Sequence, residues 1–317
     1  MSKPNILVVG SINMDLMIYG VPKIPKYGET VFCDNYSYVP GGKGANQALA
    51  VALQGANSTM VGRVGNDENG HIIKQELENS GVNTDYIIVD KKTQTGLDPI
   101  LVNNTGKYVS YVVLGGNNCL QPVDVENALK DNEYDMLIMQ LEMPLEMVYK
   151  TYELATKRNI PVFLDAGPAM TISFERLKGI YIISPNEAET EALTGITIDT
   201  EKRARKAARL LYEEIQAVYV ILKMGSRGVL LYDGKEAKMI PAFKINAIDS
   251  TGAGDTFGAT LAVQLCKGVG INKAIVISQA AAGICVSRKG AQPSIPSEKE
   301  VNDYLQKHNT DFERSLL

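Results

Sequence analysis

Short apolar runs alternate with longer amphipathic stretches along most of the chain. The apolar runs predict buried strands of a parallel sheet, at residues 6–9, 58–64, 85–89, 136–141, 162–165, 180–184 and 218–223. The stretches with helical spacing predict helices, at residues 45–54, 69–79, 145–157, 187–193 and 200–215. This order predicts an α/β fold with a doubly wound, mostly parallel central sheet flanked by helices.

Two segments interrupt the alternation of strand and helix. Residues 11–39 are rich in Tyr and Val, are broken by Gly and Pro, and lack a helical period, which predicts short strands in a hairpin-like layer. Residues 96–114 hold two apolar runs around an Asn-Asn-Thr-Gly turn, which predicts another hairpin. These two segments could pair as a separate small sheet.

The last third of the chain predicts a hairpin on the main sheet and three closing helices. The hairpin runs over residues 228–232 and 238–241, on either side of Asp233 and Gly234. Ser297 and Glu300 have the spacing of a capping box for the final helix. We find no repeat and no long linker, so we expect one domain over residues 1–317.

Composition adds limits on compartment and partners. The chain has 317 residues, 45% hydrophobic and 21% charged, with a net charge of -4 and no run of Lys and Arg, which argues against nucleic-acid and membrane-surface partners. The N-terminal apolar run is too short for a signal peptide, and no stretch is long enough to span a membrane. We expect a cytoplasmic protein.

Cysteine and histidine are scarce and scattered. The four cysteines, at positions 33, 119, 266 and 285, lack CxxC spacing, and the only histidines are His71 and His308. This pattern argues against zinc clusters and histidine-based triads. We expect buried free thiols, as in a reducing cytoplasm.

Polar residues follow several predicted strands. Asn13 and Asp15 come after the first strand, and Glu142, Asn186 and the stretch 249–255 follow later ones. Ligands of such sheets bind beyond the carboxyl ends of the strands, so these residues are expected at one site. Asn13 and Asp15 share a face if the segment is extended, where they could hold two vicinal hydroxyls or form a solvated strand face.

The stretch DSTGAGDTF at residues 249–257 combines a glycine turn with the start of a helix. Unpaired amides and the positive end of the helix dipole suit an anion there. Asp255 inside such a turn could act as a general base beside a reacting phosphate. Alternatively, it could satisfy the first turn of a surface helix.

Three further strings each permit a functional and a structural interpretation. GGKGANQA at 41–48 matches neither a P-loop nor a dinucleotide fingerprint, so it could hold a small polar ligand or be a plain turn. Asn186 and Glu189 could coordinate magnesium through water or cap a helix. KMGSRG at 223–228 could wrap a nucleotide or form a hairpin turn.

Taken together, these strings resemble the ribokinase-like carbohydrate kinase family over nearly the full length of the chain. The matching strings are GSINMD at 10–15, GGKGANQA at 41–48, QLEMPLE at 140–146, SPNEAE at 184–189, GSRGV at 225–229, DSTGAGDTF at 249–257 and SRKGAQPS at 287–294. The resemblance implies ATP-dependent transfer of phosphate to the 5-hydroxyl of D-ribose. It makes Asp255 the catalytic base and implies an anion hole formed by its amide with those of Gly252, Ala253 and Gly254.

The resemblance also implies three sets of binding residues. The sugar would be held by Asn13, Asp15, Gly41, Gly42, Lys43, Asn46 and Glu142. ATP and its Mg²⁺ would be held by Asn186, Glu189, Lys223, Gly225, Ser226, Gly228 and Gln279. A K⁺ ion would be bound, mostly by backbone oxygens, at Asp249, Thr251, Cys285, Arg288, Gly290 and Ser294.

Residues 11–40 and 96–114 match the family's β-sheet lid, which implies a homodimer through this sheet. Two positions depart from the family pattern on the expected adenine side: Lys223, where a small polar residue is common, and Gln279, where histidine is frequent. Asn13, which deoxyribose kinases of the family tend to lack, favours ribose. The alternatives are a kinase for 2-deoxyribose, fructose, a keto-sugar acid or a nucleoside, or a catalytically silent sugar- or nucleotide-binding regulator.

Overall fold

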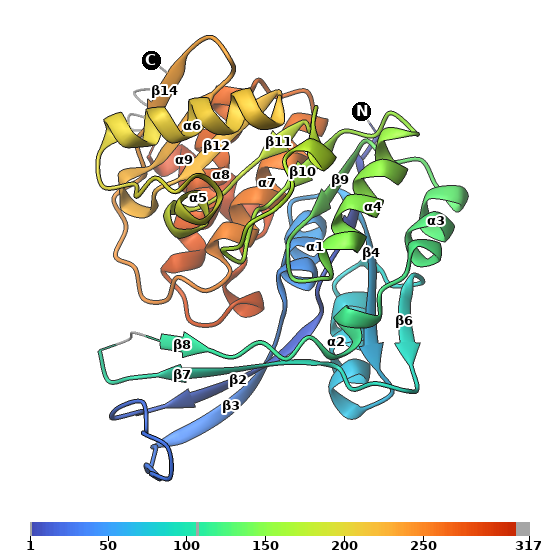
Figure 1. Cartoon of the computed structure of the whole chain (residues 1–317), viewed down its shortest axis with the longest axis vertical. Helices are drawn as coiled ribbons and strands as arrows, with labels where there is room; N and C mark the ends of the chain where they lie inside the picture. Colours follow the sequence, from blue (N-terminus) through green and yellow to red (C-terminus); the bar gives the residue numbers. More distant parts are fainter. Residues whose placement is uncertain (1, 106–107, 309–317) are drawn as a thin grey trace.

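The computed structural model describes residues 2–105 and 108–308 and consists of a large helix-flanked sheet with a smaller sheet projecting from it (Figure 1). Within the described residues the large sheet has ten strands, in the order β14-β13-β12-β11-β10-β9-β1-β4-β5, with β6 also paired to β4. Neighbouring strands are parallel, except that β13 pairs antiparallel with both β12 and β14. This confirms the predicted fold class.

The strands of the large sheet are β1 (Asn5–Val9), β4 (Asn57–Gly65), β5 (Val82–Asn83), β6 (Ile87–Asp90), β9 (Met136–Met139), β10 (Val162–Leu164), β11 (Ile182–Ile183), β12 (Tyr219–Lys223), β13 (Val229–Tyr232) and β14 (Ala237–Ile240). The helices are α1 (Lys43–Leu53), α2 (Glu68–Asn79), α3 (Pro122–Asp131), α4 (Leu145–Thr156), α5 (Glu187–Thr194), α6 (Glu201–Ile215), α7 (Ala253–Cys266), α8 (Ile271–Val286) and α9 (Glu298–Lys307).

Strand β1 shows how the sequence divides the core. Side chains alternate along a strand, so Leu7 and Val9 point to one face while Ile6 and Val8 point to the other. The first face packs against helices α3, α4, α5 and α6, and the second against α1, α2, α7 and α8. Both faces are covered, which explains why the strands read as continuous apolar runs.

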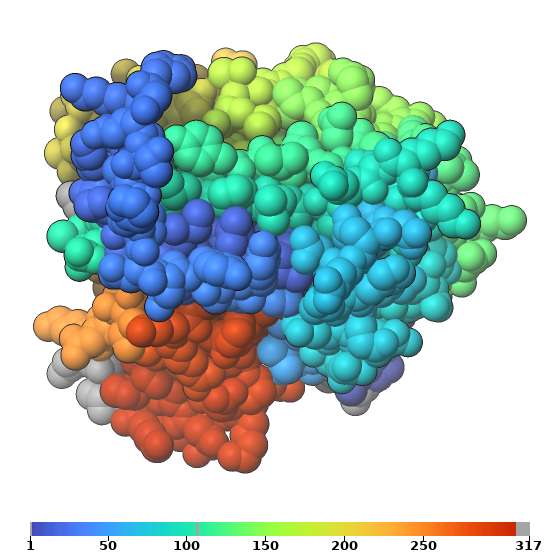
Figure 2. All heavy atoms as spheres, turned by 90° about the horizontal axis from the view of Figure 1, so that it is seen from below, coloured from blue at the N-terminus to red at the C-terminus, as the bar shows by residue number. Residues whose placement is uncertain are grey.

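The small sheet joins the two segments that interrupt the alternation. Its strands are β3 (Asn35–Gly41), β2 (Asn13–Tyr19), β7 (Gly96–Val102) and β8 (Tyr108–Ser110), in that order. β2 pairs antiparallel with β3 and parallel with β7, so the predicted pairing of the two segments is confirmed. Seen from below, the two segments lie side by side on the surface of the protein (Figure 2). Strand β3 passes into helix α1 through Gly42 alone.

The structure differs from the sequence predictions in three places. Helix α3 was not expected, although Pro122 at its start and the capping pair Gln121 and Asp124 are helix signals. The stretch 249–255 does not follow the sheet directly, because a loop over 241–252 separates it from β14. The four thiols are free as predicted, but only Cys285 is buried, and Cys33 is exposed in the loop before β3.

No helix in residues 2–105 and 108–308 has both the length and the apolar character needed to cross a bilayer.

Candidate functional site

A cavity of about 890 Å³ lies where the carboxyl ends of the main strands meet the small sheet and the start of α7. Most of the predicted site residues line it: Asn13, Asp15, Gly42, Lys43, Asn46, Glu142, Asn186, Glu189, Lys223, Gly225, Ser226, Gly228, Thr251, Gly252, Ala253, Gly254, Asp255 and Gln279. The other predicted residues, Gly41, Asp249, Cys285, Arg288, Gly290 and Ser294, do not line the cavity.

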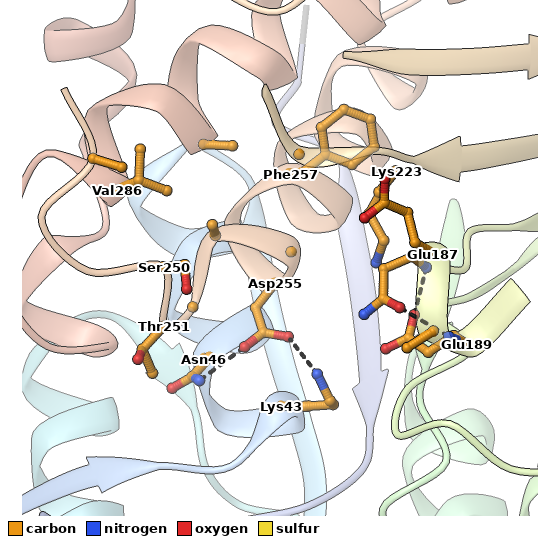
Figure 3. Close-up of a pocket in the computed structure, with 18 of the residues that line it drawn as sticks. Lys43, Asn46, Glu187, Glu189, Lys223, Ser250, Thr251, Asp255, Phe257 and Val286 are labelled. Carbon is orange, nitrogen blue, oxygen red and sulfur yellow. Dashed lines mark hydrogen bonds and ion pairs between the residues drawn. The ribbon is translucent and has the colours of Figure 1, made fainter. Parts of the chain in front are cut away.

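Asp255 lies in the first turn of α7 with its carboxylate turned toward α1 (Figure 3). Asn46 Nδ2 donates a hydrogen bond to Asp255 Oδ2 at 2.9 Å, and Lys43 Nζ lies 3.9 Å from Oδ1. Gln47 Nε2 also donates to Oδ1, at 3.4 Å. The carboxylate is therefore held by side chains of another helix, and the alternative that it caps its own helix is wrong.

Burial dominates the electrostatics of Asp255. It raises the pKa of the carboxyl above its usual value, while the nearby Lys43 ammonium acts in the opposite direction. Burial would lower the pKa of Lys43, but neighbouring carboxylates, Asp255 foremost, outweigh burial and raise it. Lys43 therefore stays charged beside a carboxyl whose proton affinity is higher than in water, as suits a general base.

The start of α7 leaves amides available for an anion. Gly252 precedes the helix with φ 77°, a left-handed conformation that favours glycine, and no side chain in the described structure caps the helix there. Amides in the first turn of a helix lack intrahelical acceptors. The Ala253 amide already donates to the Ser250 carbonyl at 3.3 Å, so the amides of Gly252, Gly254 and Asp255 are the donors that, with the positive end of the dipole, suit an anion in the cavity.

Asp15 and Glu142 place carboxylates at the end of the cavity near the small sheet. Glu142 Oε2 accepts hydrogen bonds from Ser11 Oγ at 2.5 Å and from the Lys43 amide at 3.2 Å. Burial raises the pKa of Asp15 to about 8, and neighbouring carboxylates add to the shift, those of Asp98, Glu142 and Asp255. A methyl group on Gly41 would collide with the Asp15 carboxylate, so Gly41 makes room for it.

Asn13 and Asn46 present amide groups to the same region. Asn13 is 2% exposed, and its Oδ1 accepts a hydrogen bond from Asn117 Nδ2 at 2.7 Å. Asn46 is 4% exposed, and its Oδ1 has no partner within residues 2–105 and 108–308. A buried amide oxygen without a partner costs free energy unless a ligand hydroxyl or amine reaches it.

The opposite end of the cavity carries the residues predicted for the nucleotide. Asn186 and Glu189 form a reciprocal capping box at the start of α5, with hydrogen bonds of 2.9 Å and 2.6 Å between side chains and backbone. The capping interpretation of this pair is therefore confirmed. Gly225 and Ser226 lie in the turn between β12 and β13, which is the predicted hairpin turn.

Lys223, one of the residues predicted to hold ATP and its Mg²⁺, lines the cavity beside the start of α7. Its ammonium pairs with the buried carboxylate of Asp165 and lies 3.5 Å from where a Cβ on Gly254 would be. Lys223 is therefore a cation beside the amides of α7. Gln279 lines the cavity and donates from Nε2 to the Ile240 carbonyl at 3.0 Å.

Asp249 organises the loop before α7. Its carboxylate accepts hydrogen bonds from the Thr251 amide at 3.0 Å, the Thr251 hydroxyl at 2.7 Å and the Gly290 amide at 2.9 Å. Burial opposes ionisation of Asp249, but these hydrogen bonds outweigh it and hold the pKa below its usual value. The ionised Asp249 carboxylate thus joins the turn at 249–252 to the segment at 285–294 through Gly290. Within that segment, Cys285 Sγ lies 3.0 Å from Ser294 Oγ. The Arg288 side chain points to Glu300 instead.

Sequence reasoning missed three polar residues at this site. Gln47 bridges Asp255 to Asp165, whose Oδ2 accepts from Gln47 Nε2 at 2.9 Å. Asp98 lines the cavity from β7. Gln47 stands within the GGKGANQA string and Asp165 ends a predicted strand, so position alone could have suggested both. Asp98 lies inside an apolar hairpin, where the sequence gives no signal.

Comparison with known proteins identifies the family. The model of the pfkB family of carbohydrate kinases matches residues 3–298. The chain belongs to this family. As a carbohydrate kinase it is an enzyme that transfers phosphate to a sugar.

Full-length relatives agree with this assignment. The carbohydrate kinase is 36% identical to a ribokinase of Haemophilus influenzae, covering 96% of this chain and 99% of the relative. It is 34% identical to a deoxyribokinase of Salmonella typhi, covering 95% and 98%. Its fold matches an Arabidopsis thaliana ribokinase complexed with ribose and ATP, with TM-score 0.87, 31% identity and coverage of 96% and 99%.

Proposed function

We propose that the protein phosphorylates D-ribose at O5 with ATP to give D-ribose 5-phosphate. The observation that carries the proposal is the buried Asp255 carboxylate at the amide-rich start of α7. The 36% identity to a ribokinase over 96% of the chain supports ribose as the substrate. A reaction that uses ATP also favours a cytoplasmic location, which cell fractionation would test.

The proposed mechanism is an in-line displacement. Asp255 accepts the proton from the sugar O5, which attacks the γ-phosphorus of ATP, and ADP leaves. The amides of residues 252–255 donate to the oxygens of the transferring phosphoryl group. Lys43, 3.9 Å from Asp255, and Lys223, beside Gly254, balance the charge that develops there.

The sugar would lie against the small sheet. Asn13, Asp15, Asn46 and Glu142 offer hydrogen-bonding groups to its hydroxyls. Gly41 leaves room for the Asp15 carboxylate, and Gly42 leaves room for the backbone of residues 11–13. A site of buried polar groups rejects a sugar that lacks the matching hydroxyl, because those groups then stay unpaired. This supports discrimination against 2-deoxyribose.

The nucleotide would occupy the end of the cavity lined by Asn186, Glu189, Gly225, Ser226 and Gln279. Mg²⁺ would enter with ATP as part of the substrate. Asn186 and Glu189 already hold each other in a capping box, so they fit a magnesium ion bound through water rather than directly. Gly228 has φ 98° and keeps the hairpin turn compact next to β14.

A K⁺ ion would bind at the loops around Asp249. The donor set fits a monovalent cation: Asp249 is ionised, and its hydrogen bonds hold the 249–252 and 285–294 loops together. Thr251, Cys285, Arg288, Gly290 and Ser294 would contribute mostly backbone oxygens. When bound, the cation would add positive charge beside the amides of α7.

A substrate panel run with and without potassium tests the function. We expect turnover of MgATP with D-ribose to exceed that with 2-deoxyribose, fructose, a keto-sugar acid and adenosine, and to fall when tetramethylammonium replaces potassium. Preference for 2-deoxyribose or adenosine would assign the protein to a sibling kinase. Ribose binding without ATP turnover would instead indicate a silent regulator. Equal activity in both cations would refute the potassium site.

The small sheet would act as a lid over the sugar and as the contact of a homodimer. Its surface exposes large apolar side chains, with exposed fractions of 68% for Tyr36, 56% for Tyr38 and 58% for Tyr111. Exposed apolar surface of this kind marks interaction sites. We expect Tyr36→Ser combined with Tyr38→Ser to convert a dimer to monomers in sedimentation equilibrium. A wild-type protein that is monomeric at tens of micromolar would contradict this.

A further inference from the structure

Asp98 lies beside the proposed sugar site on β7, a strand that carries none of the predicted site residues. It stands directly opposite Asp15 in the parallel pairing of β7 with β2, and it lines the same cavity. Its Oδ1 is buried and has no hydrogen-bond partner among the described residues. The cavity therefore contains a carboxylate oxygen that needs a donor from a ligand.

The surroundings of Asp98 are acidic. Burial and the charge of Glu142 raise the pKa of Asp98, although hydrogen bonds from the Ser110 side chain and the Tyr111 backbone act in the opposite direction. Asp98 in turn contributes to the raised pKa of Asp15. Of the two lysines that line the cavity within the described residues, Lys43 lies 3.9 Å from Asp255 and Lys223 pairs with Asp165. Within the described residues, these carboxylates do not form a group that could hold a metal ion. A ligand rich in hydrogen-bond donors would satisfy them instead.

We propose that Asp98 is a specificity-determining residue, which accepts a hydrogen bond from a hydroxyl group of a neutral sugar and repels sugars that carry a carboxylate or phosphate. The inference rests on the proposed function and refines its substrate class. A neutral sugar supplies donors to Asp98 and Asp15 together, because the two residues are cross-strand neighbours. An anionic group at the same place meets the carboxylates of Asp98 and Glu142, and the lysines that line the described part of the cavity already pair with other carboxylates. Asp15, whose pKa burial raises to about 8, adds to the repulsion as pH rises toward that value.

The position of Asp98 on the small sheet adds a consequence for the proposed lid. Asp98 belongs to β7, whereas Glu142 and Asp255 belong to the main body of the protein. Movement of the small sheet would bring Asp98 toward or away from those two carboxylates. Discrimination against anionic sugars would therefore be strongest when the small sheet lies over the cavity.

The test compares Asp98→Asn and Asp98→Ala with the wild type. D-ribose is the neutral probe, and D-ribonate is the anionic probe, measured as a competitive inhibitor. We expect Asp98→Asn to lower the inhibition constant of D-ribonate about 10-fold or more, because a like charge is removed while the shape is kept. The KM for D-ribose should rise a few-fold in Asp98→Asn and more in Asp98→Ala, with kcat nearly unchanged.

Asp34→Asn is the matched control, because Asp34 is an exposed carboxylate just before β3 that does not line the cavity. This control should change neither the inhibition constant of D-ribonate nor the KM for D-ribose. Unchanged constants in both Asp98 variants would overturn the proposal. If the wild type does not phosphorylate ribose, the proposed function fails by itself. Calorimetric binding of D-ribonate to the wild type and to Asp98→Asn then still decides the role of Asp98, because tighter binding to the variant supports it and equal binding refutes it.

Discussion

Asp255→Asn is expected to lower kcat with D-ribose by about 100-fold to 10,000-fold, the usual contribution of a general base. The amide keeps the size of the side chain, and its oxygen can still accept a hydrogen bond from Asn46 or Gln47, but it cannot accept the O5 proton. The KM for ATP should change little, because the amides of residues 252–255 remain in place. Steady-state kinetics with each substrate varied in turn would measure both effects.

The stability of the same variant separates chemistry from unfolding. Burial raises the pKa of Asp255, so the wild-type carboxylate is ionised at a cost that the neutral asparagine does not have. The melting temperature of Asp255→Asn should therefore be equal to that of the wild type or higher. Near-normal kcat in a folded variant would exclude Asp255 as the base.

Asp15→Asn is expected to make folding stability less dependent on pH. The pKa of Asp15 is about 8 in the folded protein and 3.8 as its ordinary value. Between these values the folded protein keeps a proton that the unfolded chain releases, so the free energy of unfolding falls as pH rises. Asp15→Asn does not have this decrease, so its free energy of unfolding should rise relative to that of the wild type by roughly 1 kcal/mol for each pH unit from 4 to 8.

Urea unfolding of ligand-free protein at several pH values would measure this difference. At pH 4 the two proteins should be about equally stable, and at pH 8 the variant should be clearly the more stable. Asp34→Asn, which removes an exposed carboxylate just before β3, should follow the wild type at every pH. A constant difference between Asp15→Asn and the wild type would show that Asp15 does not titrate in this range.

The architecture was predictable because its signals are local. Buried strands such as β1 and β9 read as apolar runs, and helices such as α6 begin at a capping residue and keep one apolar face. Helix α3 was missed although its start also carries local signals, because the stretch after the second hairpin was not assigned to any element. The pairing of β2 with β7 needs a contact between distant segments, which only the interruption of the pattern suggested.

The site was predictable where its residues stand in glycine-rich strings. Asp255, Lys43 and Asn46 belong to two such strings, and the structure brings them within hydrogen-bonding or ion-pairing distance. Asp98 could not be found, because its meeting with Asp15 depends on the register of a parallel pair. The two interpretations of Asn186 with Glu189 could be separated only by seeing their reciprocal hydrogen bonds.

Strand β3 joins α1 through Gly42, so the small sheet is attached to the main body of the protein next to Lys43 and Asn46, which contact Asp255. Gly42 has φ 86°, and a Cβ there would lie 2.7 Å from the Asn13 amide nitrogen, so the joint is short and tightly enclosed. The loop between β2 and β3 lies at the outer end of the small sheet (Figure 1). In the proposed lid motion, a rotation about Gly42 would carry that loop through a long arc and Lys43, the next residue, through a short one. Such a motion would uncover the proposed sugar site while the groups around Asp255 stay in place.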